Sequence, residues 1–349
     1  MFRKLLMAFG AVLLLLVLTI GIFLSGGPKF PEASDSIIAR AIESGPPELV
    51  MGETGYANSS GSKIWYELIQ PPKPKFSNPK GTILLIMGAG ASSMLWSPEW
   101  MQTLASEGYQ VIRFDNRGTG MSDWGDNWQD NQPYSLEDMA KDALAVMNAN
   151  GVKQAHVVGV SMGGMIAQRL AISHGDRVLS LVSMSTTGHL LDPTLSEPDS
   201  SFGLEMMRLV LKYTLTGSES GMIKMWMGVF DLMRSDSLQE KDVRDVANLV
   251  LYEIRKRRGF NQNAMKQHFA AMEVSGSRLD EMGKIKCPVL VIHGTTDNSV
   301  TIAHARKYAP LIPGVKTLWL EGEGHLIRES AMPEVNDAVF KLFEFEKIE

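Results

Sequence analysis

Short apolar runs alternate with polar stretches of helical spacing along most of the chain from residue 54 onward. Continuous apolar runs are typical of strands buried on both faces of a parallel sheet, because the connecting helices cover both faces. Helical spacing is clearest at 136–150 and 162–174. The pattern predicts an α/β fold with a mostly parallel sheet, whose strands are expected at 54–58, 63–69, 82–87, 110–114, 155–160, 179–184, 288–292 and 315–320.

The alternation breaks between residues 189 and 276, where helical patterns continue without an intervening strand and methionines are frequent. Methionine fills irregular apolar space and adapts to varied ligands. We therefore expect a helical cap at 189–276. It would be inserted between a first part of the core at 54–188 and a second part at 277–349, with its methionines packed in the cap or lining a pocket beneath it.

The amino-terminal segment is strongly apolar. Arg3 and Lys4 precede twenty uncharged residues at 5–24, and a helix of that length spans about 30 Å, the thickness of the hydrocarbon core of a bilayer. A secretory signal has a shorter apolar region of about 7–15 residues. We expect a membrane anchor at 1–24, or a secreted protein if this segment is cleaved. The two basic residues predict a cytoplasmic amino terminus, with the rest of the chain on the periplasmic or extracellular side.

Residues 25–53 differ in composition from the segments on either side. They are rich in Gly, Pro, Ser and Glu, with Gly-Gly-Pro at 26–28 and Gly-Pro-Pro at 45–47. Such segments are typical of linkers. We expect a tether with one short helix around 36–43.

Composition narrows the function classes. The chain has 349 residues, a net charge of −5 and a single cysteine, Cys287. The negative charge argues against a nucleic-acid-binding protein that relies on a basic surface. One cysteine excludes an intramolecular disulfide and a cysteine-rich zinc site. The histidines are scattered and no H-E-x-x-H is present, so no metal site is expected.

The clearest chemical signal is G-V-S-M-G at 159–163, which begins at the end of the expected strand 155–160 and precedes a helical pattern. G-x-S-x-G in a strand–turn–helix context places a serine on a tight turn with its hydroxyl exposed at the end of the sheet. The flanking glycines are needed where a Cβ would clash. We therefore expect Ser161 to be a nucleophile and the backbone N–H of Met162 to face a developing oxyanion.

With this motif the chain resembles serine hydrolases of the α/β-hydrolase fold, from residue 54 to its end. M-G-A-G at 87–90 follows a strand where that family has its oxyanion loop, and D-N-R-G-T-G-M-S at 115–122 matches the family's D-x-R-G-x-G-x-S turn. The segments 85–88 and 111–115 are most similar to aclacinomycin methylesterase-like proteins. The resemblance implies the backbone N–H of Ala89 as the second oxyanion donor. The family's loop begins H-G, and here Met87 replaces the histidine.

A serine nucleophile requires a base and an acid that orients it, which follow the serine in this family in the order acid, then histidine. His325 in G-E-G-H after the strand at 315–320 is the expected base. Asp297 in T-T-D after the strand at 288–292 is the expected acid. Glu321, Glu323 and the more distant Asp123 are alternatives for the acid. His293 is expected to be a core histidine.

These residues predict a serine hydrolase that cleaves a carboxylic ester through an acyl-enzyme. No cofactor is needed, and the partners expected are a hydrophobic small-molecule ester and the membrane. A C–C bond hydrolase, a lactonase or a cofactor-free haloperoxidase (perhydrolase) of the same fold stays open. A non-catalytic, membrane-tethered binding protein is a further alternative. A dinucleotide site at G-A-G 88–90 is disfavoured, because Pro98 interrupts the helix that should receive the pyrophosphate.

Overall fold

A single eight-stranded sheet forms the centre of the molecule, with the strand order β1-β2-β4-β3-β5-β6-β7-β8. The computed structural model describes residues 21–73, 75, 78–125, 128–129, 132–195 and 200–345. β1 pairs antiparallel with β2, and β2 antiparallel with β4, whereas every other neighbouring pair is parallel. The strands are Glu53–Ser59, Ser62–Ile69, Thr82–Ile86, Gln110–Phe114, Ala155–Val160, Val178–Met184, Val289–Gly294 and Lys316–Leu320. The predicted mostly parallel sheet is confirmed.

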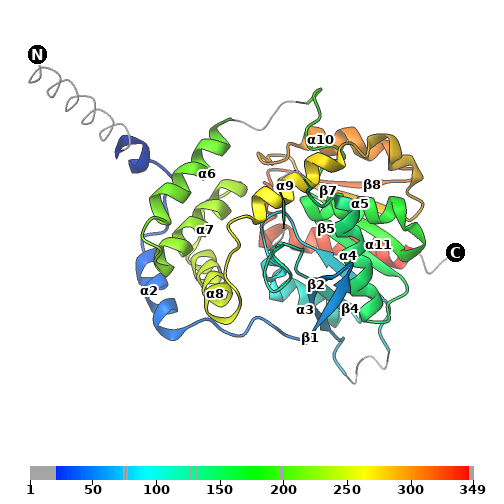
Figure 1. The fold of residues 1–349 in the computed structure, drawn as a ribbon, viewed down its shortest axis with the longest axis horizontal. Coiled ribbons are helices and arrows are strands. Elements are labelled where there is room, and N and C mark those ends of the chain that lie inside the picture. Colours follow the sequence, from blue (N-terminus) through cyan, green and yellow to red (C-terminus); the bar gives the residue numbers. More distant parts are fainter. Residues whose placement is uncertain are drawn as a thin grey trace, which may run out of the picture.

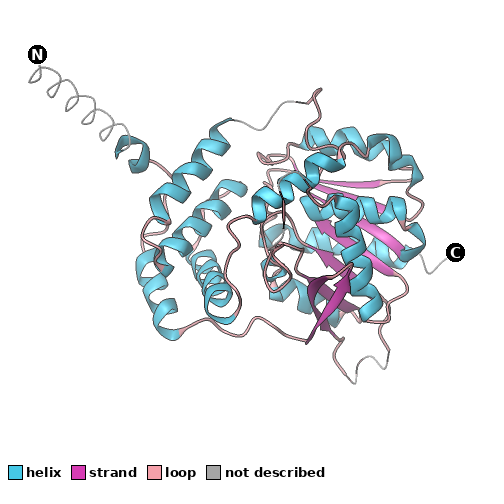
Figure 2. Ribbon diagram, in the orientation of Figure 1, coloured by secondary structure: helices cyan, strands magenta, loops and turns pink. Residues whose placement is uncertain are grey.

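Helices cover both faces of the sheet (Figure 2), which explains why its inner strands are apolar throughout. On β3, Leu84 and Ile86 point into one core, whereas Ile83 and Leu85 point into the other. The first core is completed by α4 (Leu136–Ala149), α5 (Met162–Ser173) and α10 (Ile302–Tyr308), and the second by α3 (Pro98–Ser106) and α11 (Met332–Phe345). Short 3-10 helices lie at Ser93–Leu95, Gly175–Arg177, Leu279–Lys284, Ala309–Leu311 and Glu329–Ala331.

A group of helices enters between β6 and β7 and lies to one side of the sheet (Figure 1), in the region where a helical cap was expected. It consists of α6 (Ser200–Tyr213), α7 (Glu219–Met233), α8 (Glu240–Lys256) and α9 (Ala264–Ser275). Residues of α7 and α8, among them Met227 and Val250, form an apolar core separate from those of the sheet. α9 instead contributes Ala271 and Met272 to the core of the sheet.

The segment predicted to be a tether is partly packed. It contains α2 (Ser34–Ser44), at the place where a short helix was expected, and Ile37, Ile38 and Ala41 of this helix are buried against α7 and α8. A free tether is therefore wrong for this part of 25–53. The apolar spacing of α2 supplies the missing face of the cap core, which the Gly- and Pro-rich composition around it did not indicate.

The uncharged segment 5–24, predicted to be a membrane anchor, lies outside the described residues except for 21–24, which are helical. No helix within the described part of the chain is long and apolar enough to cross a membrane.

A buried ion pair ties the end of the amino-terminal segment to the sheet. Arg113 on β4 donates from Nε to Oε2 of Glu67 on β2 at 2.6 Å, and neither side chain is exposed. Arg113 also donates to the carbonyl oxygen of Leu49 at 2.7 Å, and Glu67 accepts from the N–H of Gly52 at 2.6 Å. The pair therefore holds residues 49–52 against the sheet, just before β1 begins, where the chain has left α2 on the cap.

Replacing Arg113 by methionine is expected to lower the free energy of unfolding by about 3–5 kcal/mol, because Glu67 would stay buried without its cationic partner. The matched control is Lys141→Met, which removes an exposed pair with Asp138 and should cost no more than about 1 kcal/mol. Urea unfolding followed by circular dichroism measures both. Equal costs for the two variants would contradict the proposed importance of the buried pair.

Candidate active site

The turn between β5 and α5 consists of one residue, Ser161. Its backbone has φ 55° and ψ −125°, a left-handed conformation that costs a non-glycine residue about 1–3 kcal/mol. The neighbouring glycines permit it. A Cβ on Gly159 would lie 2.2 Å from the carbonyl oxygen of Gly163, and a Cβ on Gly163 would lie 2.1 Å from that of Ile86. The G-x-S-x-G pattern is thus a steric requirement of this turn, which leaves the Ser161 side chain partly exposed.

Hydrogen bonds hold the Ser161 backbone in place. Its N–H donates to the carbonyl oxygen of Met184 at the end of β6 at 2.9 Å, and its carbonyl oxygen accepts from Oγ1 of Thr186 at 2.6 Å. The N–H of Met162 begins α5 and is among the first-turn groups that have no acceptor within their own helix. Together with the positive end of the helix dipole, this makes the turn a favourable place for negative charge.

The loop at 87–90 packs directly against the serine. A Cβ on Gly88 would lie 3.1 Å from the Cβ of Ser161. Two side chains hold the loop on either side of Ala89. Asn116 donates from Nδ2 to the carbonyl oxygen of Met87 at 2.8 Å, and the N–H of Gly90 donates to Nδ1 of His268 at 2.9 Å.

His325 and Asp297 form a buried pair at the carboxyl ends of β7 and β8. Nδ1 of His325 is 2.7 Å from Oδ2 of Asp297, and the two residues are 5% and 4% exposed. The other oxygen of Asp297 accepts from the N–H groups of Ser299 and Val300 at 2.9 and 2.8 Å. The carboxylate therefore orients the imidazole and is itself held by the backbone of its own loop.

The protonation state of Asp297 follows from its neighbours. Burial by itself raises the pKa of Asp297, but the charge of His325 and the hydrogen bond from His293 together lower it by more, so that the net pKa is well below its usual value. Nε2 of His293 lies 2.7 Å from the carbonyl oxygen of Val300 and 3.3 Å from Oδ2 of Asp297. His293 is buried in the core, as expected, and in addition contacts the carboxylate.

Two alternative acids are engaged elsewhere. Glu323 accepts from Nε of Arg328 at 2.7 Å, and Asp123 accepts from the N–H of Lys63 at 2.7 Å. Of the carboxylates considered from the sequence, Asp297 is the one that the structure brings to His325. Ser161, His325 and Asp297 all follow parallel strands, so they lie at the same edge of the sheet.

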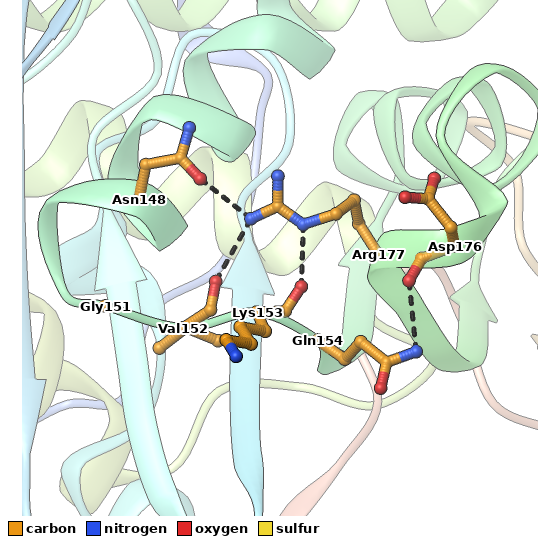
Figure 3. A pocket seen from close by; sticks show the side chains of 7 residues that line it. All are labelled: Asn148, Gly151, Val152, Lys153, Gln154, Asp176 and Arg177. Carbon is orange, nitrogen blue, oxygen red and sulfur yellow. Dashed lines mark hydrogen bonds between the residues drawn. The ribbon is translucent and has the colours of Figure 1, made fainter.

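A surface hollow of about 540 Å³ lies at the opposite edge of the sheet (Figure 3). Its residues precede β5 and β6, whereas Ser161 follows β5. The guanidinium of Arg177 crosses it and donates to the carbonyl oxygens of Val152 and Lys153 and to Oδ1 of Asn148. The hollow is therefore remote from the serine, and the arginine that lines it is bonded to the neighbouring parts of the fold.

The family model described as "alpha/beta hydrolase fold" matches residues 81–330, a range that includes both the Ser161 turn and the His325–Asp297 pair. This chain belongs to the α/β-hydrolase fold family. It is a hydrolase of that fold, and the expected similarity to methylesterases is confirmed by two relatives.

The relatives cover most of this hydrolase. It is 31% identical over 289 residues to rhodomycin D methylesterase DauP of Streptomyces sp. (strain C5), covering 76% of this chain and 89% of the relative. It is 29% identical to rhodomycin D methylesterase DnrP of Streptomyces peucetius, covering 70% and 85%. Among solved structures, an enol-lactonase from Burkholderia xenovorans LB400 has a TM-score of 0.60 at 21% identity, covering 83% of this chain and 99% of that one, which shows the shared fold.

His268 on α9 is the residue that sequence reasoning missed. It lay away from the positions expected for a base, yet the fold of this hydrolase places it on the loop beside Ser161. No local signal could have found it, because it is 178 residues from Gly90 in the sequence and belongs to another layer of the structure.

Gly163→Ala is expected to destabilise the hydrolase by about 1–3 kcal/mol and to displace the serine turn, because the added Cβ would meet the backbone of β3. Gly203→Ala is the matched control: this helical glycine on α6 has open space around it, and alanine there should stabilise by about 0.5–1 kcal/mol. Thermal unfolding of both variants measures the difference. A tolerated Gly163→Ala would contradict the steric account of the turn.

Asp297→Asn is expected to destabilise the protein more at about pH 6 than at about pH 3, by a difference on the order of 1 kcal/mol. Because the pKa of Asp297 is lower in the folded state than in the unfolded state, its stabilising contribution is present above the usual carboxyl pKa and is lost as the pH falls toward the folded-state value. Urea unfolding of both proteins at the two pH values measures it. A cost that stays constant or grows at low pH would contradict the assignment.

Proposed function

We propose that this protein is a serine hydrolase that cleaves a carboxylic ester, with Ser161 as nucleophile, His325 as base and Asp297 as orienting acid. The observation that carries the proposal is the His325–Asp297 hydrogen bond of 2.7 Å at the sheet edge where Ser161 sits in its left-handed turn. In such a triad the carboxylate selects the imidazole tautomer that has a free Nε2.

The proposed reaction proceeds through an acyl-enzyme. Nε2 of His325 takes the proton of Ser161 as Oγ attacks the ester carbonyl, and the backbone N–H groups of Ala89 and Met162 stabilise the oxyanion. Collapse of this intermediate breaks the bond to the alcohol, which leaves with the proton from His325. Water then attacks the acyl group as His325 accepts its proton, and a second collapse releases the acid and restores Ser161.

The ionisation of Asp297 supports this assignment. A carboxylate held in its charged form favours the imidazolium that His325 becomes in both transition states. Preorganised donors such as the two N–H groups contribute roughly 3–4 kcal/mol each to lowering the barrier.

The substrate is proposed to be a hydrophobic ester. Methylesterase relatives support ester cleavage. The cap supports an apolar substrate, because Met265 of α9 lies over the loop beside the serine. A Cβ placed on Gly90 of that loop would lie 2.3 Å from Sδ of Met265. Met265 and Phe269, one helical turn apart, are 44% and 49% exposed. Exposed apolar side chains beside the proposed oxyanion loop suit an apolar acyl or alcohol group.

A membrane location is also part of the proposal. The twenty uncharged residues at 5–24, preceded by Arg3 and Lys4, are long enough to anchor the enzyme with its amino terminus in the cytoplasm and its catalytic domain on the other side.

Ser161→Ala is expected to lower kcat on p-nitrophenyl butyrate by a factor on the order of 10⁶ without lowering the melting temperature, because it removes the nucleophile alone. Labelling by a fluorophosphonate probe should disappear in parallel. Ser60→Ala, at another left-handed serine in the β1–β2 turn, is the control and should keep full activity. An active, folded Ser161→Ala protein would refute the proposed function.

Lengthening the acyl group from acetate to butyrate is expected to raise kcat/KM roughly 10-fold, because each methylene buried in an apolar pocket is worth about 0.8 kcal/mol. Met265→Ala should reduce this preference while retaining turnover of the acetate. Initial rates on the two p-nitrophenyl esters measure it. Equal turnover of both esters by the native enzyme would argue against a hydrophobic substrate.

A further inference from the structure

The cap helix α6 has an apolar outer face. Leu204, Met207, Val210 and Leu211 are between 41% and 50% exposed, and Leu215 just beyond the helix is 76% exposed. Leu204, Met207 and Leu211 follow one another at intervals of three and four residues and so form one stripe. The opposite side of α6 is packed: Leu209 is fully buried against Gly228 of α7. A helix with apolar side chains on both its packed and its open face requires an explanation.

The beginning of the described chain lies on this helix. The ring of Phe23 is 4.6 Å from the guanidinium of Arg208, and Nζ of Lys212 donates to the carbonyl oxygen of Gly26 at 2.9 Å. Figure 1 shows this blue amino-terminal segment beside α6. Ile22, the next large apolar side chain before Phe23, is 73% exposed. The uncharged sequence 5–24 therefore ends against the same helix that carries the apolar stripe.

We propose that the outer face of α6, formed by Leu204, Met207, Val210, Leu211 and Leu215, rests on the lipid bilayer. The proposal depends on the membrane location proposed above and goes beyond it, because it gives the cap a second contact with lipid. Apolar side chains flanked by Arg208 and Lys212 are typical of helices that lie in a membrane interface, although Arg208 is also paired with Glu205. A bilayer fits this face better than a second copy of the chain does, because the stripe lies on the same helix that Phe23, at the end of the uncharged sequence 5–24, contacts.

The test uses the full chain with Cys287→Ser and an NBD fluorophore on Met207→Cys, reconstituted in phosphatidylcholine–phosphatidylglycerol vesicles that contain or lack doxyl-labelled lipid. The control carries the fluorophore on Leu311→Cys. Leu311 lies outside the cap, in the part of the chain that forms the sheet, and its exposure of 44% is close to the 50% of Met207. Doxyl lipid should lower the fluorescence at position 207 roughly twofold or more and leave position 311 unchanged.

Other outcomes overturn the proposal in distinguishable ways. If the protein floats with the vesicles but doxyl lipid does not quench position 207, the membrane anchor is supported and the proposed contact of α6 with lipid is wrong. If the protein does not float with the vesicles, both the membrane anchor and the α6 contact are wrong. A disulfide between two unlabelled Met207→Cys chains, with no lipid quenching of the labelled protein, would assign this face to a second copy. Ester hydrolysis in solution tests the proposed catalytic function independently of all three.

A second observation concerns His268, which is fully buried on α9. Nδ1 accepts from the N–H of Gly90 at 2.9 Å, and Nε2 is 2.7 Å from the carbonyl oxygen of Arg117, to which it donates. Burial lowers the pKa of His268 to about 4, against the opposing effect of the Arg117 hydrogen bond, so the ring is neutral at physiological pH. The two bonds define one tautomer, with the proton on Nε2.

We infer that His268 is a positioning residue for the oxyanion loop. His268 accepts a hydrogen bond from the N–H of Gly90 and so holds the loop just after Ala89. Asn116 donates to the carbonyl oxygen of Met87 and holds the loop before Ala89. Ala89 lies between these two hydrogen-bonded residues, so its backbone position relative to the serine turn depends on both bonds. The inference rests on the proposed role of Ala89 and adds to it a cap residue that acts through the loop.

Two conservative variants separate its two bonds. In His268→Asn the amide oxygen can replace Nδ1 as acceptor for Gly90, whereas in His268→Gln the amide N–H can replace Nε2 as donor to Arg117. We expect His268→Gln to lower kcat roughly 10²-fold with little change in KM and weaker binding of a boronic acid inhibitor, and His268→Asn to keep most of kcat.

Thermal unfolding provides the structural control, since both variants lose one buried hydrogen bond. Equal kcat for the two variants, or a loss confined to KM or to the melting temperature, would overturn the positioning role. Activity in Ser161→Ala would instead refute the proposed function itself, so the two failures are distinguishable.

Discussion

The close approach of three backbones at the serine turn is the constraint on which the rest of the site depends. β3, β5 and the start of α5 come so near that a Cβ on Gly159 or Gly163 would overlap a carbonyl group. This contact forces Ser161 into a left-handed conformation and places it beside the loop at 87–90. The strain of one residue is supported by a sheet whose inner strands are buried on both faces.

The cap is coupled to this site through buried polar groups as well as apolar contacts. Arg257, the residue after α8, pairs with Asp115 at the end of β4 and with Glu253 of α8. Asp115 also accepts from the N–H and the hydroxyl of Ser93, three residues after the Gly90 that His268 holds. The cap and the loop at 87–90 are therefore joined through buried hydrogen bonds and ion pairs, and a satisfied buried polar network of this kind makes the structure more rigid.

Much of the architecture could be predicted from local sequence. The strands follow from continuous apolar runs and the serine turn from two glycines, because each of these features has a cause within a few residues. Asp297 and His325 could be chosen because each follows a predicted strand in the order that the resemblance to α/β-hydrolases implies, and the structure brings them within 2.7 Å. Their catalytic roles, and those of Ala89 and Met162, stay predictions that the proposed variants test.

The sequence by itself determined the parallel sheet, its order of strand and helix, and the residue that must occupy the strained turn, since backbone sterics and side-chain periodicity act locally. Only the tertiary structure decided that α2 completes the cap core and that His268 holds the N–H of Gly90. Both contacts join segments more than 170 residues apart in the chain. Their energies depend on how separate layers pack, and no local pattern records which buried partner a helix or an imidazole will meet.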